Sequence, residues 1–525
     1  MAFPPFSRRT FAAQAAIWAG TALATGAGAR RAFAAPTFLN DPFQLGVAAG
    51  DPVPDGFMIW TRLAPDPYDA KALPPEAIPV GWEVAADPKF QKRVASGTAY
   101  AQPHLAHSVH VDVKGLEHGR PYYYRFHCGA AVSRTGRAMT LSTPRMPLQK
   151  LKFAFASCQH YEQGYFTAFR DMIAQDPDFI LHLGDYIYES SWGTTVRQMP
   201  GAEARTLDQY RLLHAVYKAD PDLQNAHAHC AHFFMWDDHE AANDYSRLES
   251  DRDRDPAAFL ARRAAAYQAY YEHMPLRPSA MPQADGMTLY KRVDFGDLMD
   301  MAICDLRQYR DPIPCQTADK HMGQVVDVAK CPEIFDANRT MLGKEQERSL
   351  TGGWARTNAK WNVLAQTLMF AGFDQMEGPG RGIFTDNWGG YPAAKRKILD
   401  LVKKRNKDYG QQNFICLGGD IHSFFVSDVK DDDLNPNSET LMTEFVCTSV
   451  TSESYNTAVF AALLKENPQM KFIDDTVRGY VLCEVTPQTW TSTLRMVENV
   501  RVREPKFRTR AKFVVESGRA GAQSA

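Results

Sequence analysis

Four short apolar runs are each followed by side chains that ionise, and this pattern constrains the fold more than any other feature of the chain. The runs are LKFAFAS (151–157), DFILHL (178–183), HFFMW (232–236) and FICLG (414–418), each of strand length. The side chains that follow them are Cys158, Asp185 and Tyr188, Asp238 and His239, and Asp420 and His422. Because ligands in α/β sheets gather beyond the carboxyl ends of strands, we expect these side chains to share one rim.

The segment between the first two runs has the spacing of a helix. GYFTAFRDMIAQ (164–175) repeats its apolar residues with helical periodicity, so residues 151–183 form a predicted βαβ unit. Further buried-strand candidates are LMDMAI (298–303), EFVCTS (444–449) and YVLCEV (480–485). The pattern predicts an α/β domain.

The N-terminal part has a different pattern. FMIWTRL (57–63), IPVGWEVA (78–85), SVHVDVKGL (108–116) and YYYRFHC (122–128) are short β runs separated by Pro, Gly and Asp, which predicts a β-sandwich. The stretch LEHGRPY, ending at Tyr122, resembles the corner of fibronectin-like domains, where a tyrosine hydroxyl ties the strand to the upstream backbone. A domain boundary is expected near STPRMPLQK (142–150).

The first 35 residues resemble a twin-arginine export signal. Ser7-Arg8-Arg9-Thr10-Phe11 precedes an apolar, small-residue region, and Ala32-Phe33-Ala34 supplies a cleavage site. Residues 1–34 contain four arginines and no other charged residue, so cleavage changes the formal net charge from −2 to −6. This acidic balance argues against general binding to nucleic acid. In an oxidising compartment, Cys315 and Cys331 are the candidates for a disulfide.

The side chains expected at the rim need a counter-charge. A thiol, a phenol, carboxylates and imidazoles packed together would repel and desolvate one another, so the pattern predicts metal ions. Thiolate and phenolate with carboxylate and imidazole suit iron, whereas carboxylate and amide oxygens suit calcium, magnesium or manganese. In two-metal hydrolases a carboxylate bridges ions about 3.5–4 Å apart and a water between them becomes the nucleophile. Asp185, at the central strand end, is the expected bridge.

Six strings carry a resemblance to a known family. FASCQ, LHLGDYIYE, WDDHE and GGDIHS occur in this order, with CDLRQYR and DNWGGYPAAKR between the last two. The chain resembles the alkaline phosphatase D (PhoD-like) family of the calcineurin-like metallophosphoesterases over nearly its whole length. Where the wider superfamily has Asp, Asn and His, this chain has Cys158, Asp238 and Asp420, as the PhoD-like branch does.

The resemblance implies a mixed-metal site. Fe(III) would be held by Cys158, Asp185, Tyr188 and His422, and Ca(II) by Asp185, Asp238 and Asp420. Asn243 is a further candidate oxygen ligand, and additional calcium is possible in the family. His239 would be the catalytic acid that protonates the leaving oxygen, with Asp185 as the bridging group.

Several nearby residues have competing interpretations. Arg307 and Arg310 are candidate substrate-binding residues that clamp phosphate, with ion pairs to Asp305 or Asp311 as the alternative. His160 either binds metal or supports a residue that does. We expect Asp237 and His182 to point away from the metals, and the histidines of HAHCAHF (227–233) to pack between a helix and a strand. Trp388 and Tyr391 either shape the pocket or pack a loop.

The resemblance also implies the domain order. We expect a signal peptide at residues 1–35, a fibronectin-like β-sandwich at 36–146, and a phosphatase domain at 147–510, with a flexible tail at 511–525. The phosphatase domain would be a metallophosphoesterase-type β-sandwich flanked by helices.

The expected activity is that of an alkaline phosphatase and phosphodiesterase. It would hydrolyse small phosphate mono- and diesters with a metal-bound hydroxide, after export to the periplasm or beyond by the twin-arginine translocase. A first alternative is a phospholipase-D-like phosphodiesterase that acts on phospholipid head groups. A second is an exported envelope-binding protein with a structural metal site.

Overall fold

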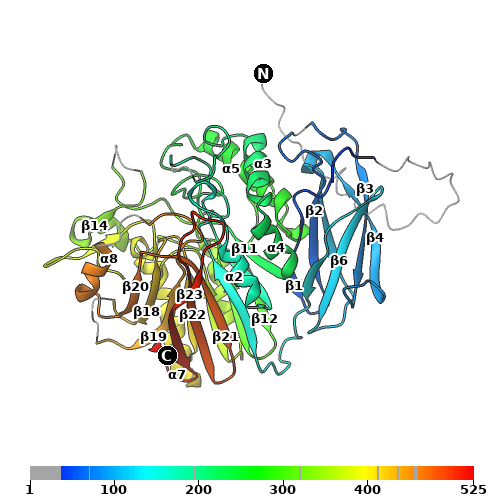
Figure 1. Ribbon diagram of the computed structural model, residues 1–525. Helices are drawn as coiled ribbons and strands as arrows, with labels where there is room; N and C mark the ends of the chain where they lie inside the picture. The colour runs from blue at the N-terminus through cyan, green and yellow to red at the C-terminus, as the bar shows by residue number, and fades with distance from the viewer. Residues whose placement is uncertain are drawn as a thin grey trace. The chain divides into compact units, whose positions relative to one another are not determined.

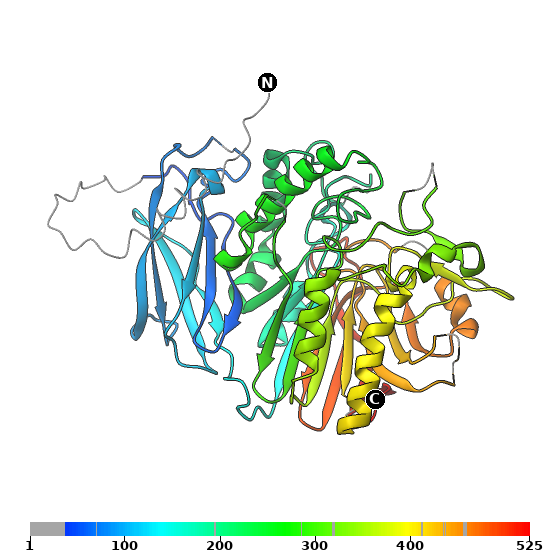
Figure 2. The ribbon, with the colours of Figure 1, turned by 180° about the vertical axis from the view of Figure 1, so that it is seen from behind.

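Two large β-sheets form the part of the chain that carries the candidate site (Figures 1 and 2). The computed structural model describes residues 37–525 except 70, 194–195, 285, 318–320, 411–412, 434, 436 and 455–458. The predicted export signal at residues 1–35 lies outside the described residues. All elements named below belong to the unit Phe38–Ala525.

The larger sheet has ten strands. They are β1 (Val47–Val53), β2 (Gly56–Arg62), β5 (Ser108–Val113), β9 (Leu151–Ala156), β10 (Phe179–Leu183), β11 (Ala231–Met235), β21 (Arg478–Val485), β22 (Thr489–Val497), β23 (Phe507–Glu516) and β24 (Gln523–Ser524). Their order is β24-β23-β22-β21-β9-β10-β11-β1-β2-β5, with β9, β10 and β11 parallel. Every residue of β10 and β11 is buried, as expected for parallel strands covered on both faces.

The second sheet has seven strands. They are β12 (Lys291–Phe295), β13 (Met299–Ile303), β15 (Trp361–Ala365), β17 (Phe414–Gly418), β18 (Phe424–Lys430), β19 (Thr440–Val446) and β20 (Met470–Asp474). Their order is β12-β13-β15-β17-β19-β18-β20, with β13, β15, β17 and β19 parallel. The inner faces of the two sheets share one hydrophobic core. In it, Phe179 stacks on Phe153 and on Phe295, with ring centroids 4.8 and 4.9 Å apart.

Helices pack around this sandwich. They are α2 (Ala168–Ala174), α3 (Leu207–Lys218), α4 (Pro221–His229), α5 (Pro256–His273), α6 (Gly343–Trp354), α7 (Pro392–Tyr409) and α8 (Val459–Ala462). Figure 2 shows α6 and α7 across the outer face of the seven-stranded sheet, where Trp354 packs on Phe414. The expected sandwich of sheets flanked by helices is confirmed. No helix among the described residues combines the length and the apolar character needed to span a bilayer.

The N-terminal sandwich forms as the sequence predicts. A five-stranded sheet of β3 (Ile78–Ala85), β4 (Arg93–Ala101), β6 (Pro121–Cys128), β7 (Ala131–Val132) and β8 (Gly136–Met139) packs on β1, β2 and β5 through a common core. Tyr122 makes the predicted corner, because its hydroxyl accepts a hydrogen bond from Glu117 N at 3.0 Å. A separate pair, β14 (Val325–Asp327) with β16 (Gly382–Phe384), lies outside both sandwiches.

The N-terminal sandwich and the larger domain share a sheet. The chain passes from β8 to β9 through residues 140–150, where the sequence predicts a boundary, yet β1 pairs in parallel with β11. This pairing gives β11 a second neighbour, so the central parallel strands have no open edge on that side. On the sandwich side, Trp60 of β2 donates a hydrogen bond to Glu272 O of α5 at 3.0 Å.

The expected flexible tail from residue 511 is wrong. Strand β23 runs to Glu516 and pairs with β22 along its whole length, and β24 pairs with β23 near the end of the chain. The alternation of buried Phe513 and Val515 with more exposed neighbours supplies an apolar face that the basic composition of the segment obscures. The predicted Cys315–Cys331 disulfide is confirmed, with Cα atoms 5.8 Å apart.

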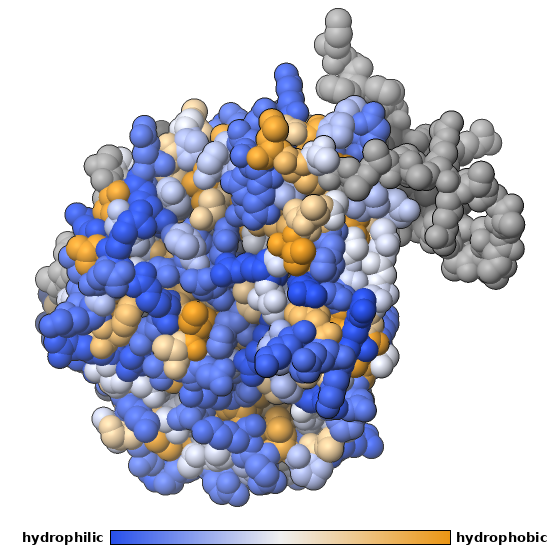
Figure 3. All heavy atoms as spheres, turned by 45° about the vertical axis from the view of Figure 1, so that its right-hand side comes forward, coloured by the Kyte–Doolittle hydropathy of each residue, from blue (hydrophilic) through white to orange (hydrophobic). Residues whose placement is uncertain are grey.

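Hydrophilic side chains predominate on the face drawn in Figure 3, and the apolar ones form small separate patches. Patches of this kind are ordinary on soluble domains. This face therefore gives no sign of a broad apolar docking surface.

One lysine is buried where the N-terminal sandwich meets α3. Lys218 is 1% exposed, and its Nζ lies 4.5 Å from the ring centroid of Trp60 and 5.3 Å from that of Tyr186. Burial lowers the pKa of Lys218 to about 7. Above that pH the folded chain carries this lysine neutral, while the unfolded chain keeps it protonated to about pH 10.

We expect Lys218→Met to remove a pH dependence of stability. Between about pH 7 and pH 10 the unfolded state binds the additional proton, so the wild-type free energy of unfolding rises with pH by at most about 1.4 kcal/mol per unit from this group. Urea titrations at several pH values measure the slope. Lys344→Met, at an exposed lysine of α6, is the control and should keep the wild-type slope. Equal slopes for Lys218→Met and the wild type would contradict this expectation.

Candidate metal centre

The predicted site residues meet where the two sheets converge. Cys158, Asp185 and Asp238 follow the parallel strands β9, β10 and β11, and Asp420 and His422 follow β17 of the other sheet. Ser157, after β9, bridges to Ser449, after β19, so the carboxyl ends of both sheets lie together. Cys158 N donates to Gly184 O at 3.1 Å, which docks the first loop on the second.

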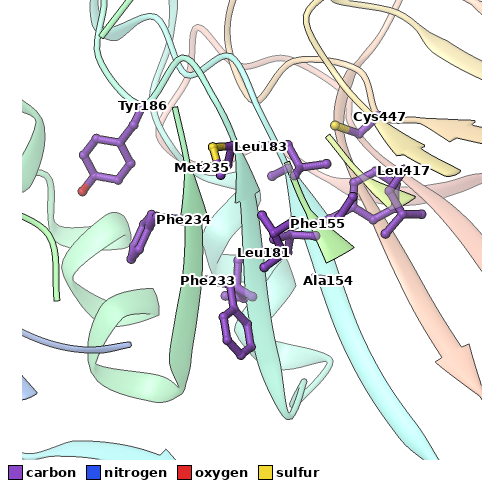
Figure 4. Close-up of a cluster of buried hydrophobic side chains, with 14 of the residues drawn as sticks. Ala154, Phe155, Leu181, Leu183, Tyr186, Phe233, Phe234, Met235, Leu417 and Cys447 are labelled. Atoms are coloured by element: carbon purple, nitrogen blue, oxygen red, sulfur yellow. The ribbon is translucent and has the colours of Figure 1, made fainter. Parts of the chain in front are cut away.

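An apolar core supports the loops from below. Figure 4 shows Phe155, Leu183 and Met235 of the larger sheet together with Leu417 of β17 and Cys447, the residue after β19, packed beneath the strand ends. The polar side chains of the candidate site follow directly above this buried layer. The core thus fixes where each loop begins.

The first cluster holds the residues expected to bind iron. Ligand atoms of Cys158, Asp185 and His422 all lie within 4.8 Å of one another. The Tyr188 hydroxyl donates to Asp185 Oδ2 at 3.0 Å and lies 3.2 Å from His422 Nε2. All four side chains are buried. The structure therefore brings the predicted quartet together.

The second cluster adjoins the first through Asp185. Asp185, Asp238 and His239 form one group of atoms within 4.8 Å, and Asp237, Asp238 and Asp420 form another. Asp185 is thus the residue common to the thiolate cluster and the carboxylate cluster, as the bridging prediction requires. Its Oδ1 has no hydrogen-bond partner among the described residues, so a buried oxygen is left for a cation.

The electrostatics of both clusters call for positive charge. Burial, and then the neighbouring acidic groups, raise the pKa of Cys158, Asp185, Tyr188 and Asp420 well above their ordinary values. These groups ionise together at neutral pH only when a cation offsets their mutual repulsion. A donor set of one thiolate, one phenolate, imidazole and several carboxylates fits metal binding.

The backbone is strained at the same residues. Cys158, Asp185, Asp420 and His422 have φ angles of 60°, 55°, 66° and 54°, in the left-handed region that non-glycine residues seldom occupy. Such strain persists only where the surrounding structure holds it, and it concentrates at functional sites. The side-chain directions of four predicted ligands are therefore set by left-handed turns at the strand ends.

Two glycines permit the loops to approach. Gly184 has φ +85°, and a Cβ there would lie 2.8 Å from Asp237 N. A Cβ on Gly419 would lie 2.8 Å from Ser157 Cβ. Both glycines are needed for close approach of the strand ends.

The two imidazoles are oriented by partners on their far side. His422 Nδ1 lies 2.7 Å from Glu453 O, and because a carbonyl oxygen only accepts, Nδ1 carries the proton and Nε2 is left to bind metal. His239 Nδ1 lies 2.7 Å from Glu189 Oε2, so its Nε2 faces the clusters, 4.0 Å from Asp238 Oδ2. Burial lowers the pKa of His239, but Glu189, Asp238 and Asp185 outweigh it and raise the pKa above its ordinary value.

Sequence reasoning missed two carboxylates that organise the site. Glu240 accepts hydrogen bonds from the backbone N–H groups of Asp185, Tyr186 and Asp237 at 3.2, 2.6 and 2.8 Å, which ties the β10 loop to the β11 loop. Glu189 holds His239. Glu189 is the last residue of LHLGDYIYE, and Glu240 is the last residue of WDDHE. The acidic residue at the end of each motif is the sequence signal that could have identified them.

The arginines lie beneath the site in ion pairs. Arg307 is fully buried; it donates to Asp237 Oδ2 at 2.9 Å and to Asp386 Oδ2 at 2.7 Å, and its Nη2 lies 3.3 Å from Asp238 Oδ1. Arg310 is equally buried and donates to Asp386 Oδ1 at 2.6 Å. These partners differ from the predicted Asp305 and Asp311. The phosphate-clamp role stays a prediction, and the burial of both guanidinium groups opposes it.

Other candidates take supporting positions. Asp237 faces Arg307 and accepts from Thr367 Oγ1 at 2.7 Å, His160 packs against the Tyr188 ring at 4.3 Å, and His182 is buried in β10. Of the HAHCAHF histidines, His227 and His232 pack in the interior as expected, whereas His229 is half-buried and lies 3.1 Å from Asp176 Oδ1. Asn243 is half-buried and donates its backbone N–H to Glu189 at 3.1 Å.

Trp388 and Tyr391 are buried. They donate hydrogen bonds to Gln366 Oε1 and Asp311 O, which agrees with a packed loop.

Comparisons with known proteins agree with this geometry. The family model described as PhoD-like phosphatase matches residues 153–494, and the model of the PhoD-like phosphatase N-terminal domain matches residues 28–142. Alkaline phosphatase D of Bacillus subtilis (strain 168) is 41% identical over 530 residues, covering 98% of this chain and 88% of its own. A solved structure described as "Structure of PhoD" superposes with a TM-score of 0.88 at 41% identity, covering 93% of each chain.

We expect Gly184→Ala to lose bound metal and activity. The added Cβ would meet Asp237 while the backbone stays in the left-handed region, so the loop that carries Asp185 must shift, at a cost of about 2 kcal/mol or more. Elemental analysis and thermal unfolding measure the two effects. Gly410→Ala is the matched control, because Gly410 has φ +64° with open space around its Cα. It should lose about 1 kcal/mol and keep its metal. Full metal content in Gly184→Ala would contradict the expected displacement.

Proposed function

The chain belongs to the PhoD-like phosphatase family, and from this premise we propose that it is an exported two-metal phosphatase that cleaves phosphate mono- and diesters. The observation that carries the proposal is the junction of a thiolate cluster and a carboxylate cluster at Asp185. It occurs in a chain 41% identical to alkaline phosphatase D. A hydrolase is expected to combine such a junction with a proton donor.

The donor atoms favour two different metals. Cys158, Asp185, Tyr188 and His422 would hold Fe(III), since thiolate and phenolate stabilise a highly charged, polarisable ion. Asp185, Asp238 and Asp420 would hold Ca(II), which prefers carboxylate oxygens. When bound, such a pair supplies an activated water and offsets the negative charge of the phosphoryl group.

His239 is the proposed donor of the leaving-group proton. Its Nδ1 is held by Glu189, so Nε2 projects toward the metal clusters and donates its proton to the departing oxygen. Glu189 acts through His239, by fixing the ring and favouring its protonated form. The reaction leaves an alcohol and inorganic phosphate, or an alcohol and a monoester when the substrate is a diester.

The buried arginines support the acidic groups in this proposal. Arg307 neutralises Asp237 and Asp386 and lies beside Asp238 and Asp420, so it limits the repulsion among carboxylates that a calcium ion alone would have to offset. Arg310 holds Asp386 from the other side. Charge on an incoming phosphate would then be offset by His239 together with any cations that the acidic side chains hold.

The substrate range and the location are proposals as well. A phospholipase-D-like activity would use the same centre, and hydrolysis of phosphatidylcholine in preference to simple esters would support it. A purely structural metal site is disfavoured by the family match and by the proton donor beside the clusters. Export rests on the twin-arginine pattern at residues 7–11. It would be contradicted if the full-length chain stayed in the cytoplasm of a host with an active translocase.

The role of His239 predicts a dependence on the leaving group. We expect His239→Ala to lower kcat on an alkyl phosphate by about 10²- to 10⁴-fold. The loss should be much smaller on 4-nitrophenyl phosphate, because nitrophenolate departs without protonation. Steady-state kinetics on both esters measure the difference. Glu189→Gln, which keeps a weaker partner for Nδ1, should show the same bias with smaller losses.

The control for this prediction is His118→Ala, at an exposed histidine between β5 and β6. It should leave both rates unchanged. Equal losses on the two esters in His239→Ala, with full metal content, would show that His239 holds the site together and donates no proton.

A further inference from the structure

One tryptophan borders the metal centre and takes no part in the mechanism above. The indole of Trp192 lies 5.0 Å from the ring of His160, 5.2 Å from Tyr188 and 5.6 Å from His239, measured between centroids. It also lies 6.3 Å from the ring of His422. Trp192 is thus an aromatic neighbour of two proposed iron ligands, Tyr188 and His422, and of the proposed proton donor, His239.

The segment that carries Trp192 is fixed in place by a buried carboxylate. Trp192 N donates to Glu162 Oε1 at 2.7 Å, and Ser191 Oγ donates to Glu162 Oε2 at 2.6 Å. Farther along, the N–H groups of Val196 and Arg197 both donate to Glu162 O. Because Glu162 is 3% exposed, these bonds are sheltered from water and hold the indole against the site.

Trp192 also belongs to the half-buried residues that border the site. Cys158, Asp185, Asp238, His239 and His422 are all buried, whereas Trp192, Asn243, Asp420 and Ile421 are half-buried. Among these half-buried residues, Asp420 and Asn243 are polar and Trp192 and Ile421 are apolar. The rim therefore has an apolar side, and the indole is its largest surface.

We propose that Trp192 is the wall of a leaving-group subsite and makes the enzyme prefer esters of ring-bearing alcohols over esters of small aliphatic alcohols. The inference rests on the proposed function. His239 protonates the leaving oxygen only if that oxygen lies beside its Nε2, and the ring centroid of His239 lies 5.6 Å from that of Trp192, so the group attached to the oxygen is within reach of the indole. A flat ring in that group can stack on the half-exposed indole, while a short alkyl chain covers little of it.

The size of the preference follows from ordinary aromatic contacts. A stacked or edge-on pair contributes enough to change kcat/KM by about two- to tenfold. A contact between Trp192 and the leaving group should change the selectivity between esters. The phosphoryl group is the same in every ester, and the proposed metal site is the same for all of them. A residue that only kept the metal ligands in place would change the rates on all esters together.

The test compares benzyl phosphate with ethyl phosphate. Both esters release simple alkoxides that need a proton, so they differ mainly in the ring. We expect Trp192→Ala to lower the ratio of kcat/KM for benzyl over ethyl phosphate by about two- to tenfold. Trp192→Phe should keep most of the preference and Trp192→Leu should lose it, because leucine restores bulk but no flat ring. Trp82→Ala, at a half-buried tryptophan of β3, is the control and should keep the wild-type ratio.

Three outcomes would overturn the subsite. The ratio could stay at the wild-type value in Trp192→Ala, or Phe and Leu at position 192 could give the same ratio, or the wild type could show no preference for benzyl phosphate. Metal content, measured on each variant, identifies a general loss of the site; if Trp192→Ala loses metal, the comparison of Phe with Leu decides. If the wild type hydrolyses neither ester nor any aryl phosphate, the proposed function fails instead of the subsite.

Discussion

Repulsion among buried acidic groups is the constraint around which this molecule is arranged. The thiol of Cys158, the phenol of Tyr188 and the carboxylates of Asp238 and Glu240 lie around Asp185, and all of these side chains are buried. In an apolar interior, such groups ionise only beside positive charge. Arg307 supplies part of that charge from below, and His239 supplies part from the side. The oxygen of Asp185 that has no hydrogen-bond partner marks where the remainder must come from, and metal cations account for it.

The double-sheet fold brings these groups together. The carboxyl ends of parallel strands lie along one edge of a sheet. When two sheets face each other with these edges aligned, the loops that follow the strands of both sheets meet at one place. The approach is close enough that Gly184 and Gly419 have no room for a side chain. Four of the proposed ligand residues have left-handed backbone conformations at the strand ends. The strain is tolerable because the layer of Phe155, Leu183, Met235 and Leu417 beneath is fully packed.

Local signals explain what could be predicted from the sequence. Buried parallel strands appear in the sequence as unbroken apolar runs. A candidate metal-binding residue after such a run can be recognised without knowing which strands pair. Tyr122 was predictable for the same reason, since its corner lies within a few residues. The pairing of β1 with β11 joins residues about 180 positions apart, and the contact of Arg307 with Asp237 spans 70. Neither has a local signature. Strand β23 was missed because charged residues dominate its exposed face, and β24 was missed because it consists of only two polar residues, Gln523 and Ser524.

We propose that Asp185 joins two unlike cations, one of them bound by Tyr188. The most direct test is elemental analysis with the visible spectrum of the purified protein, compared with the Tyr188→Phe variant. We expect iron and calcium in every active preparation, and a purple to brown colour from phenolate bound to Fe(III) that Tyr188→Phe loses or shifts. An active colourless protein that holds only zinc, or a colour that Tyr188→Phe leaves unchanged, would contradict it.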